Sequence, residues 1–283
     1  MDVSNLEGRT VLVTGSGSGI GRETALAFAR RGADLVLCDI DKERVAETEQ
    51  AIRALGRGDV WSQQVDVSSE EQMRDFAAAV HERVEALDIL MNNAGVAIGG
   101  GFLDTSLDDW EWILGINLEG VILGCHLFVP RMVARGKGGH VINVSSAAGY
   151  VAAEHLAAYS TTKFAVLGLS EALRDELGPH GIGVTTVCPG IINTPITSAA
   201  RLVGPIATHQ ARHEMIRAYE RRNYGPERVA VKILRAVQRN RGVAPISPEA
   251  WLLYYLKRLA PGPLARVGRR LSDRRRRRMG LGG

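Results

Sequence analysis

Short apolar and β-branched runs alternate along the chain with longer segments in which apolar residues recur at helical spacing. Runs that are apolar on both faces are typical of strands in a parallel sheet covered by helices on both sides. The pattern therefore predicts an α/β fold with a doubly wound, parallel, seven-stranded sheet. Strands are expected at residues 10–14, 34–39, 60–65, 88–91, 140–145, 184–188 and 243–246, and helices at 22–30, 42–54, 70–87, 107–132, 159–178 and 226–240.

Two stretches interrupt this alternation. Residues 191–223 are mixed and partly helical, and they follow the end of a strand, where a segment that covers a substrate would lie. Residues 249–283 form a basic C-terminal extension. Because 283 residues with 45% hydrophobic content suit one large core, we expect a single domain at 1–248 followed by the extension.

Composition narrows the class of protein. The longest apolar stretch, 112–129, carries Asn117 and Glu119, so neither a membrane span nor a signal peptide is expected, and the location is predicted to be cytoplasmic. The three cysteines lie far apart in apolar runs and predict buried thiols rather than disulfides or a zinc site. His209 and His213 have the spacing of a helical metal pair, but no third ligand is evident, so no metal is expected.

A glycine-rich stretch from Gly15 to Gly21 follows the first predicted strand and precedes a helix. Glycines let the backbone turn tightly and approach a pyrophosphate, whose charge the free amides at the helix start attract. The spacing is Thr-Gly-x-x-x-Gly-x-Gly, because Ile20 stands where the common dinucleotide fingerprint has its third glycine. A turn without chemistry is the alternative.

Two aspartates end neighbouring strands. Asp39 lies eighteen residues after Gly21, at the position that meets the adenosine ribose in a doubly wound sheet, or is an exposed strand end. Asp66 follows the third strand and either meets the adenine edge or caps the next helix.

Asparagines supply further candidates. The stretch Asn92-Asn93-Ala94-Gly95 comes at the C-terminal end of a strand, where open α/β sheets bind ligands, or forms only a strand-ending turn. Asn117 lies in an otherwise apolar helix and needs hydrogen-bond partners, either as a structural clasp or within a polar relay.

The stretch from His140 to Lys163 carries the strongest candidate chemistry. Ser146 ends a strand, and Tyr159 and Lys163 lie four residues apart on one helix face. A cation about 4 Å from a phenol favours the phenolate by up to about 3 pK units at an effective dielectric near 20. Tyr159 can then exchange a proton with an alcohol whose oxygen Ser146 holds. A packed or snorkelling Tyr-Lys pair is the alternative.

Taken in order, these motifs resemble the short-chain dehydrogenase/reductase family from about Gly8 to Ile246. The resemblance rests on Thr14-Gly15-x-x-x-Gly19-x-Gly21, Asp66, Asn92-Asn93-Ala94-Gly95, Asn117, Ser146, Tyr159-x-x-x-Lys163 and Pro189-Gly190 with Thr194. It implies a Rossmann fold, a nicotinamide cofactor and a homo-oligomer, commonly a tetramer. It also implies the catalytic set Asn117, Ser146, Tyr159 and Lys163. The implied cofactor contacts are Gly15, Ser18, Gly19, Ile20, Gly21, Asp39, Asp66, Val67, Asn93, Ala94, Gly95, Tyr159, Lys163, Pro189, Gly190, Ile192 and Thr194.

The implied reaction is reversible hydride transfer between NAD(H) and a secondary alcohol or ketone. In it Tyr159 takes the hydroxyl proton and Ser146 steadies the oxygen. Lys163 lowers the pKa of Tyr159 and binds the nicotinamide ribose, while Asn117 holds a water that passes the proton outward. The alternative is a catalytically inactive nucleotide-binding module with a regulatory or structural role.

Two features bear on specificity. The expected pocket walls, 96–102, 147–155 and 191–215, are largely aliphatic and suggest a bulky apolar substrate. Asp39 favours NAD over NADP, because its carboxylate would repel a 2′-phosphate. Arg22 is the one nearby cation that could support NADP.

The net charge of +4 is local, because residues 266–278 hold eight arginines and one aspartate. Residues 251–259 predict an apolar helix, which Pro261-Gly-Pro263 breaks before a second, basic helix with Leu264, Val267 and Leu271 on one face. Either the apolar part packs on a neighbouring subunit or over the substrate entrance, or the tail docks on an anionic membrane. In the second case Trp251, Tyr254 and Tyr255 lie at the interface. Nucleic acid is not an expected partner, because no basic, aromatic groove accompanies the arginines.

Overall fold

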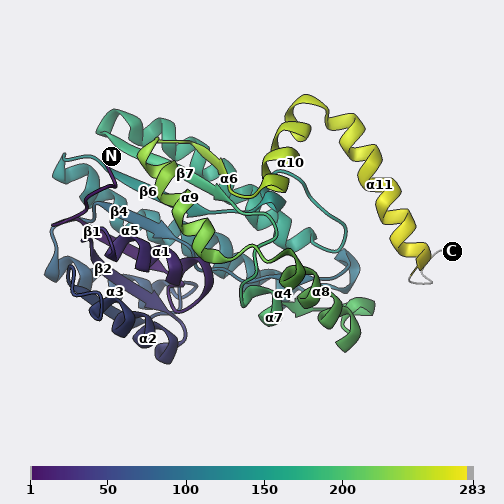
Figure 1. The fold of residues 1–283 in the computed structure, drawn as a ribbon, viewed down its shortest axis with the longest axis horizontal. Coiled ribbons are helices and arrows are strands. Elements are labelled where there is room, and N and C mark those ends of the chain that lie inside the picture. The colour runs from purple at the N-terminus through teal and green to yellow at the C-terminus, as the bar shows by residue number, and fades with distance from the viewer. Residues whose placement is uncertain (1, 279–283) are drawn as a thin grey trace.

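Seven parallel strands form one sheet in the order β3-β2-β1-β4-β6-β7-β9, and the order reverses between β1 and β4 (Figure 1). The structure is a computed structural model that describes residues 2–278, with side chains described as far as residue 270. The doubly wound sheet predicted from the sequence is thus confirmed. The strands are β1 (Thr10–Thr14), β2 (Asp34–Asp39), β3 (Val60–Gln64), β4 (Ile89–Asn92), β6 (Gly139–Val144), β7 (Ile182–Cys188) and β9 (Val243–Pro245).

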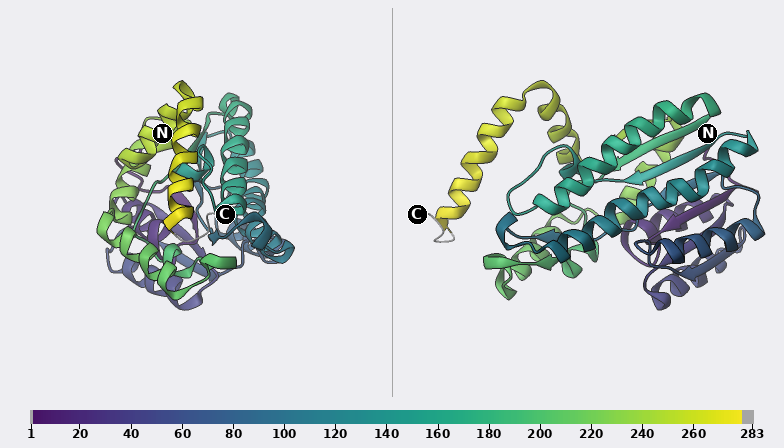
Figure 2. Two further views of the ribbon diagram at one scale, coloured as in Figure 1. Left: turned by 90° about the vertical axis from the view of Figure 1, so that its right-hand side faces the viewer. Right: turned by 180° about the vertical axis from the view of Figure 1, so that it is seen from behind.

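Helices cover both faces of this sheet, as the apolar strands require (Figure 2). One face packs against α1, α2 and α9, with Phe28 and Ile233 fully buried there. The other packs against α3, α5 and α6, with Phe76 and Phe128 fully buried. The three cysteines are free and buried, as predicted. The helices are α1 (Gly19–Ala29), α2 (Lys42–Arg53), α3 (Glu70–Arg83), α4 (Leu107–Leu114), α5 (Gly120–Arg135), α6 (Ala157–Leu177) and α9 (Pro226–Gln238).

The helix predicted at 107–132 is longer and less regular than expected. It consists of α4, a π-helical turn at Gly115–Glu119 and α5, which ends at Arg135. By length and composition alone, the run Leu107–Arg135 is one helix in the described chain that is long and apolar enough to cross a membrane. A core helix of a globular protein meets the same criteria, and Phe128 and Met132 of this helix lie in the core, so this is weak evidence for a span.

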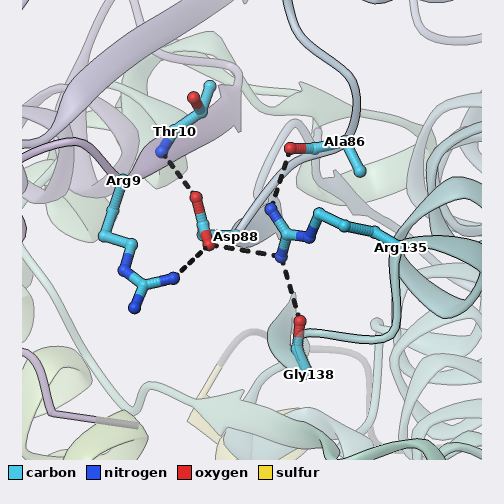
Figure 3. A network of polar contacts seen from close by, with 6 residues as sticks. All are labelled: Arg9, Thr10, Ala86, Asp88, Arg135 and Gly138. Atoms are coloured by element: carbon cyan, nitrogen blue, oxygen red, sulfur yellow. Dashed lines mark hydrogen bonds and ion pairs between the residues drawn. The ribbon is translucent and has the colours of Figure 1, made fainter.

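A charged network links the N-terminal ends of β1 and β4 to the end of α5 (Figure 3). Asp88 accepts hydrogen bonds from the Thr10 amide at 2.9 Å and from Nη1 of Arg9 at 2.8 Å. The guanidinium of Arg135 lies 3.2 Å from the same carboxylate and also donates to the carbonyls of Ala86 and Gly138. Asp88 and Arg135 are almost fully buried. The sequence pattern predicted that this strand begins at Asp88, whereas β4 begins one residue later, at Ile89. The backbone of Asp88 still pairs with both neighbouring strands, since its amide donates to the Thr10 carbonyl and its carbonyl accepts from the His140 amide.

The segment predicted to cover the substrate, 191–223, lies beyond the C-terminal end of β7 (Figure 1). It holds the short helix α7 (Ile196–Ala199) and the longer helix α8 (His209–Arg222). It also holds β8 (Arg201–Leu202), which pairs in parallel with β5 (Ile98–Gly99). The sequence did not predict this small second sheet, because two-residue strands leave no periodic pattern.

The chain ends in two helices, α10 (Pro248–Leu259) and α11 (Pro261–Arg278). The break predicted at Pro261-Gly-Pro263 is confirmed, although α11 already begins at Pro261, where the fixed φ of proline suits the first helical position. Helix α10 packs on the body: Ala250 is fully buried, and its carbonyl accepts a hydrogen bond from the Tyr150 hydroxyl at 2.7 Å. Helix α11 leaves the body beyond α10 as a separate arm (Figures 1 and 2).

Candidate active site

The glycine loop lies at the point where the sheet reverses its strand order. Gly15 and Gly19 adopt positive φ values of 61° and 54°, which glycine tolerates best. A Cβ atom on Gly15 would lie 2.7 Å from Cα of Ala94, and one on Gly21 would lie 2.1 Å from the Gly15 carbonyl oxygen. The backbone is therefore packed too closely for side chains at these positions. Helix α1 begins at Gly19 rather than at Arg22, so its free amides start inside this cradle.

Asp39 lies against the same loop. Its Oδ2 accepts a hydrogen bond from the Gly17 amide at 2.8 Å, and its Oδ1 accepts one from the Asp41 amide at 3.0 Å. Arg22, the cation that could support NADP, is paired with Glu23 at 2.8 Å. Arg44 is a second cation near this loop, and it was not predicted from the sequence. A Cβ on Gly17 would lie 2.9 Å from Cβ of Arg44. The guanidinium of Arg44 lies 3.1 Å from the Asp41 carboxylate. Arg22 and Arg44 are thus each already paired with a carboxylate.

Asp66 does not cap the following helix. Ser69 is the N-cap of α3 and accepts a hydrogen bond from the Gln72 amide, while Oδ1 of Asp66 accepts bonds from the Ser68 amide at 2.9 Å and the Ser68 hydroxyl at 2.6 Å. This local turn leaves the adenine role of Asp66 a prediction. The side chain of the next residue, Val67, is buried in the core, so only its backbone can meet a ligand.

The stretch Asn93 to Gly95 is held by the end of β1. Nδ2 of Asn93 donates to the carbonyls of Thr14 and Gly15, each at 2.9 Å. The Thr14 hydroxyl accepts hydrogen bonds from the amides of Asn93 and Ala94, each at 3.0 Å. Thr14 is therefore a positioning residue, a role that the sequence motif alone did not predict. These contacts fix the glycine loop against the end of β4.

Asn117 is fully buried within the π-helical turn and acts as a clasp. Its Oδ1 accepts a hydrogen bond from the Val96 amide at 2.8 Å, and its Nδ2 donates to the Val96 carbonyl at 3.0 Å and to the Thr162 hydroxyl at 3.2 Å. A Cβ on Gly95 would lie 3.2 Å from Asn117 Oδ1 and 3.4 Å from Nζ of Lys163. Of the two alternatives drawn from the sequence, the clasp is observed, and it lies beside Lys163.

The predicted catalytic residues meet at the C-terminal end of β6. Ser146 begins a short 3₁₀ turn, where its Oγ accepts a hydrogen bond from the Ala148 amide at 3.2 Å, and it also hydrogen-bonds to Tyr159. Lys163 is 4% exposed, and its Nζ donates to the Val144 carbonyl at 3.1 Å and lies 5.7 Å from the centre of the Tyr159 ring. The Ser145 hydroxyl, which the sequence did not single out, donates to the Lys163 carbonyl at 2.7 Å.

The proton affinities of this group differ from the sequence expectation. Burial raises the pKa of Tyr159 to about 12, and the hydrogen bond from Ser146 only partly opposes this effect. Burial also lowers the pKa of Lys163 to about 8. The predicted lowering of the Tyr159 pKa by Lys163 is therefore wrong for the structure as it stands. Desolvation of the phenolate is the largest cause of the raised pKa of Tyr159, and Lys163 is not among the groups that lower it.

The loop after β7 closes the other side of the site. The Pro189 carbonyl accepts a hydrogen bond from the Ala147 amide at 2.8 Å, next to Ser146. A Cβ on Gly19 would lie 3.3 Å from Cβ of Thr194, which places Thr194 at the glycine loop. A cavity of about 300 Å³ lies between residues 193–198 and α8, with Thr194 and Tyr219 among its lining residues.

Glu249, which the sequence did not single out, fixes the remainder of this loop. Its Oε1 accepts a hydrogen bond from the Ile191 amide at 3.1 Å, and its Oε2 accepts one from Arg222 at 2.8 Å. A Cβ on Gly190 would lie 2.6 Å from the same carboxylate, which leaves no room for a side chain there. The side chain of Ile192 is buried in the core, and that of Ile20 is half-buried against it. Glu249 thus joins α8, α10 and the loop.

The sheet reversal, the glycine cradle and the strand-end carboxylate define a dinucleotide-binding α/β protein. The family model for short chain dehydrogenases matches residues 9–202, which is more than half of the chain. The chain therefore belongs to the short chain dehydrogenase family of oxidoreductases, as the motifs predicted.

Three similar proteins illustrate the range of the family. "Probable oxidoreductase EphD" of Mycobacterium tuberculosis is 42% identical over 263 residues, which are 92% of this chain and 44% of that protein, so the chain spans less than half of this relative. Epidermal retinol dehydrogenase 2 of Mus musculus is 39% identical over 67% of this chain and 62% of its own length. A short chain dehydrogenase/reductase from Burkholderia phymatum, solved in complex with NAD, has a TM-score of 0.82 and 30% identity over 91% of this chain and 95% of its own.

Proposed function

We propose that this protein transfers a hydride reversibly between NAD(H) and a secondary alcohol or ketone. The observation that carries the proposal is the convergence of Ser146, Tyr159 and Lys163 at the end of β6, beside the glycine cradle of β1. The NAD complex of the similar Burkholderia structure supports the choice of cofactor class. The residues fit such a group, because the positive-φ glycines let the backbone approach it closely and α1 begins at Gly19, where the first amides of the helix have no partner within the helix.

The nicotinamide would accept or supply the hydride, and the chain supplies orientation and the proton. Gly15, Gly19 and Gly21 would hold the pyrophosphate, and Asp39 the adenosine ribose. Tyr159 would exchange the proton with the substrate oxygen while Ser146 donates a hydrogen bond to that oxygen. Lys163 would bind the nicotinamide ribose, and Asn117 would hold the loop at Val96 and a water beside Lys163. Asp66, Val67, Asn93, Ala94, Gly95, Pro189, Gly190, Ile192 and Thr194 would complete the cofactor site, with Ser18 and Ile20 of the loop.

The proposed substrate is bulky and apolar. Ile98, Val203 and Trp112 gather around Tyr159 in one apolar cluster. The likeness to a retinol dehydrogenase supports this class. A screen for NADH fluorescence against panels of secondary alcohols and ketones, with aliphatic members of increasing size, tests the function. Tight cofactor binding with no turnover on any member would favour the inactive nucleotide-binding module instead.

We also propose a homo-oligomer, with a tetramer as the favoured state. Ile122 lies on α5, directly after the π-helical turn that holds Asn117, and Phe164 lies on α6, which holds Tyr159. These two apolar side chains are exposed by 44% and 39%. The boundary between a dehydrogenase domain at 1–248 and an extension at 249–283 stays a prediction, although Glu249 and Ala250 contact the body. A cytoplasmic location stays a prediction as well.

NAD is expected to be used at least about tenfold better than NADP, measured as kcat/KM for the two cofactors. The reason is repulsion between a 2′-phosphate and Asp39, while Arg22 and Arg44 are already paired with carboxylates. Asp39→Asn should lower the ratio of kcat/KM with NAD to kcat/KM with NADP. Asp34→Asn, at the opposite end of the same strand, should leave this ratio unchanged. Equal kcat/KM values for both cofactors in the wild type would refute the preference.

The two directions of the reaction should respond differently to pH. Because the pKa of Tyr159 is raised to about 12, the phenol stays protonated from pH 6 to 8 and can protonate a ketone throughout. Ketone reduction should therefore be flat over this range, while alcohol oxidation, which needs the phenolate, should rise with pH. Initial rates at saturating cofactor measure both. A tenfold fall in reduction per pH unit between 6 and 8 would mean that the phenol titrates near neutrality, against this assignment.

A further inference from the structure

Helix α10 presents an exposed apolar stripe. Leu252, Tyr255, Leu256 and Leu259 recur at spacings of three and four residues and are exposed by 60%, 52%, 37% and 81%. Single exposed leucines are normal on proteins, but four neighbours on one helix face are a patch. We name these four residues the α10 stripe.

The orientation of the stripe is fixed by the opposite face of the helix. Ala250 is fully buried, and its carbonyl accepts the Tyr150 hydrogen bond. The ring of Tyr254 lies 5.5 Å from that of Tyr150 in an edge-to-face arrangement. Trp251 is half-buried and lies under the guanidinium of Arg241. Of the three aromatic residues predicted at a membrane interface, only Tyr255 belongs to the stripe, because Trp251 and Tyr254 pack on the body.

The arm that follows the stripe is basic. On α11, Arg266, Arg269 and Arg270 are exposed, Val267 is 53% exposed and Leu264 is half-buried. The sequence continues with five consecutive arginines at 274–278. The predicted place of Leu271 on the apolar face lies outside the described side chains. An exposed apolar stripe that leads directly into a cationic helix matches the two components of an anionic lipid surface, its acyl boundary and its headgroups.

We propose that the α10 stripe and the basic arm dock this protein on an anionic membrane. The leucines of the stripe and the Tyr255 ring enter the boundary between headgroups and acyl chains, where tyrosine is favoured. The arginines of α11 face the phosphates. The net charge distribution favours this occupant over a second copy, because a symmetric contact would bring two arginine arms together.

The same helix holds parts of the candidate active site. Its Glu249 bonds to the Ile191 amide, and its Ala250 bonds to Tyr150, which follows the turn after Ser146. Docking would therefore place the loops of the site beside the lipid from which an apolar substrate could enter. This consequence rests on the proposed function, but the docking itself does not, and it can be measured without any turnover.

The test is sedimentation of the full chain with phosphatidylserine-containing and pure phosphatidylcholine vesicles, at low and high salt. Binding to the anionic vesicles is expected to be at least about tenfold stronger than to phosphatidylcholine, and to fade near 1 M salt, where the Debye length falls to about 3 Å. Arg266→Gln with Arg269→Gln and Arg270→Gln should weaken it about a hundredfold, since each arginine near the surface contributes separately.

Three comparisons make the result specific. Leu252→Ser with Leu256→Ser and Leu259→Ser should abolish binding. Leu103→Ser with Leu107→Ser, at leucines outside the stripe that are exposed by 95% and 80%, should not change it. A chain that ends at Pro263 should lose the salt-dependent part of the binding to anionic vesicles. Circular dichroism and NAD binding confirm that each variant is folded. No binding at low salt, equal binding by all variants, or a stripe variant that changes only the oligomeric state would each overturn the proposal, the last in favour of a second copy.

Discussion

The variant Tyr159→Phe is expected to lose at least a hundredfold in kcat/KM, in the direction of oxidation and of reduction. Its ring should keep the packing with Ile98 and Trp112, so that only the hydroxyl that exchanges the proton is lost. A positioned acid or base contributes about 10²–10⁴-fold to a rate. Initial rates with a substrate from the alcohol and ketone screen measure the loss, and fluorescence titration with NADH should show cofactor binding nearly unchanged.

Tyr255→Phe is the matched control, because it removes the same hydroxyl from a ring that is 52% exposed on α10. This variant should keep wild-type kcat/KM with a substrate in solution. If Tyr159→Phe retained more than about a hundredth of the activity, Tyr159 would not be the proton donor. If it also lost cofactor binding, the hydroxyl would have a binding role that its hydrogen bond with Ser146 does not suggest.

Asp88→Ala is expected to lower the free energy of unfolding by about 3–5 kcal/mol, the usual cost of leaving one member of a buried ion pair without its counterion. The Arg135 side chain is only 8% exposed, so water cannot replace the lost carboxylate, and the Thr10 amide loses its acceptor as well. Chemical denaturation at one fixed protein concentration measures the change.

Arg9→Ala provides the comparison within the same network. Arg9 is 49% exposed, and an exposed pair contributes about 0–1 kcal/mol, so this variant should remain close to wild type in stability. Both variants remove a member of the network around Asp88, but only Asp88→Ala leaves the buried Arg135 without a charge partner. Equal losses in the free energy of unfolding for the two variants would show that the burial of Arg135 does not determine how much Asp88 contributes to stability.

The sequence by itself determined the sheet and the location of the site. Continuous apolar runs separated by amphipathic segments allow few folds, and the seven predicted strands are those of the structure. Parallel strands bring their C-terminal ends to one edge, so Gly15, Asp39 and Ser146 were expected together although they are far apart in the chain. In the structure Asp39 accepts a hydrogen bond from Gly17 of the glycine loop, and Ser146 follows the end of β6. Their joint role in a site stays a prediction.

Only the tertiary structure decided the energetics within that site. The helical spacing of Tyr159 and Lys163 predicted a cation beside a phenol, but spacing carries no information on burial, which raises the pKa of one and lowers that of the other. The roles of Thr14 and Glu249 likewise depend on contacts across distant segments. Local patterns report neighbours along a helix or strand, whereas desolvation and long-range hydrogen bonds arise only when separate elements pack together.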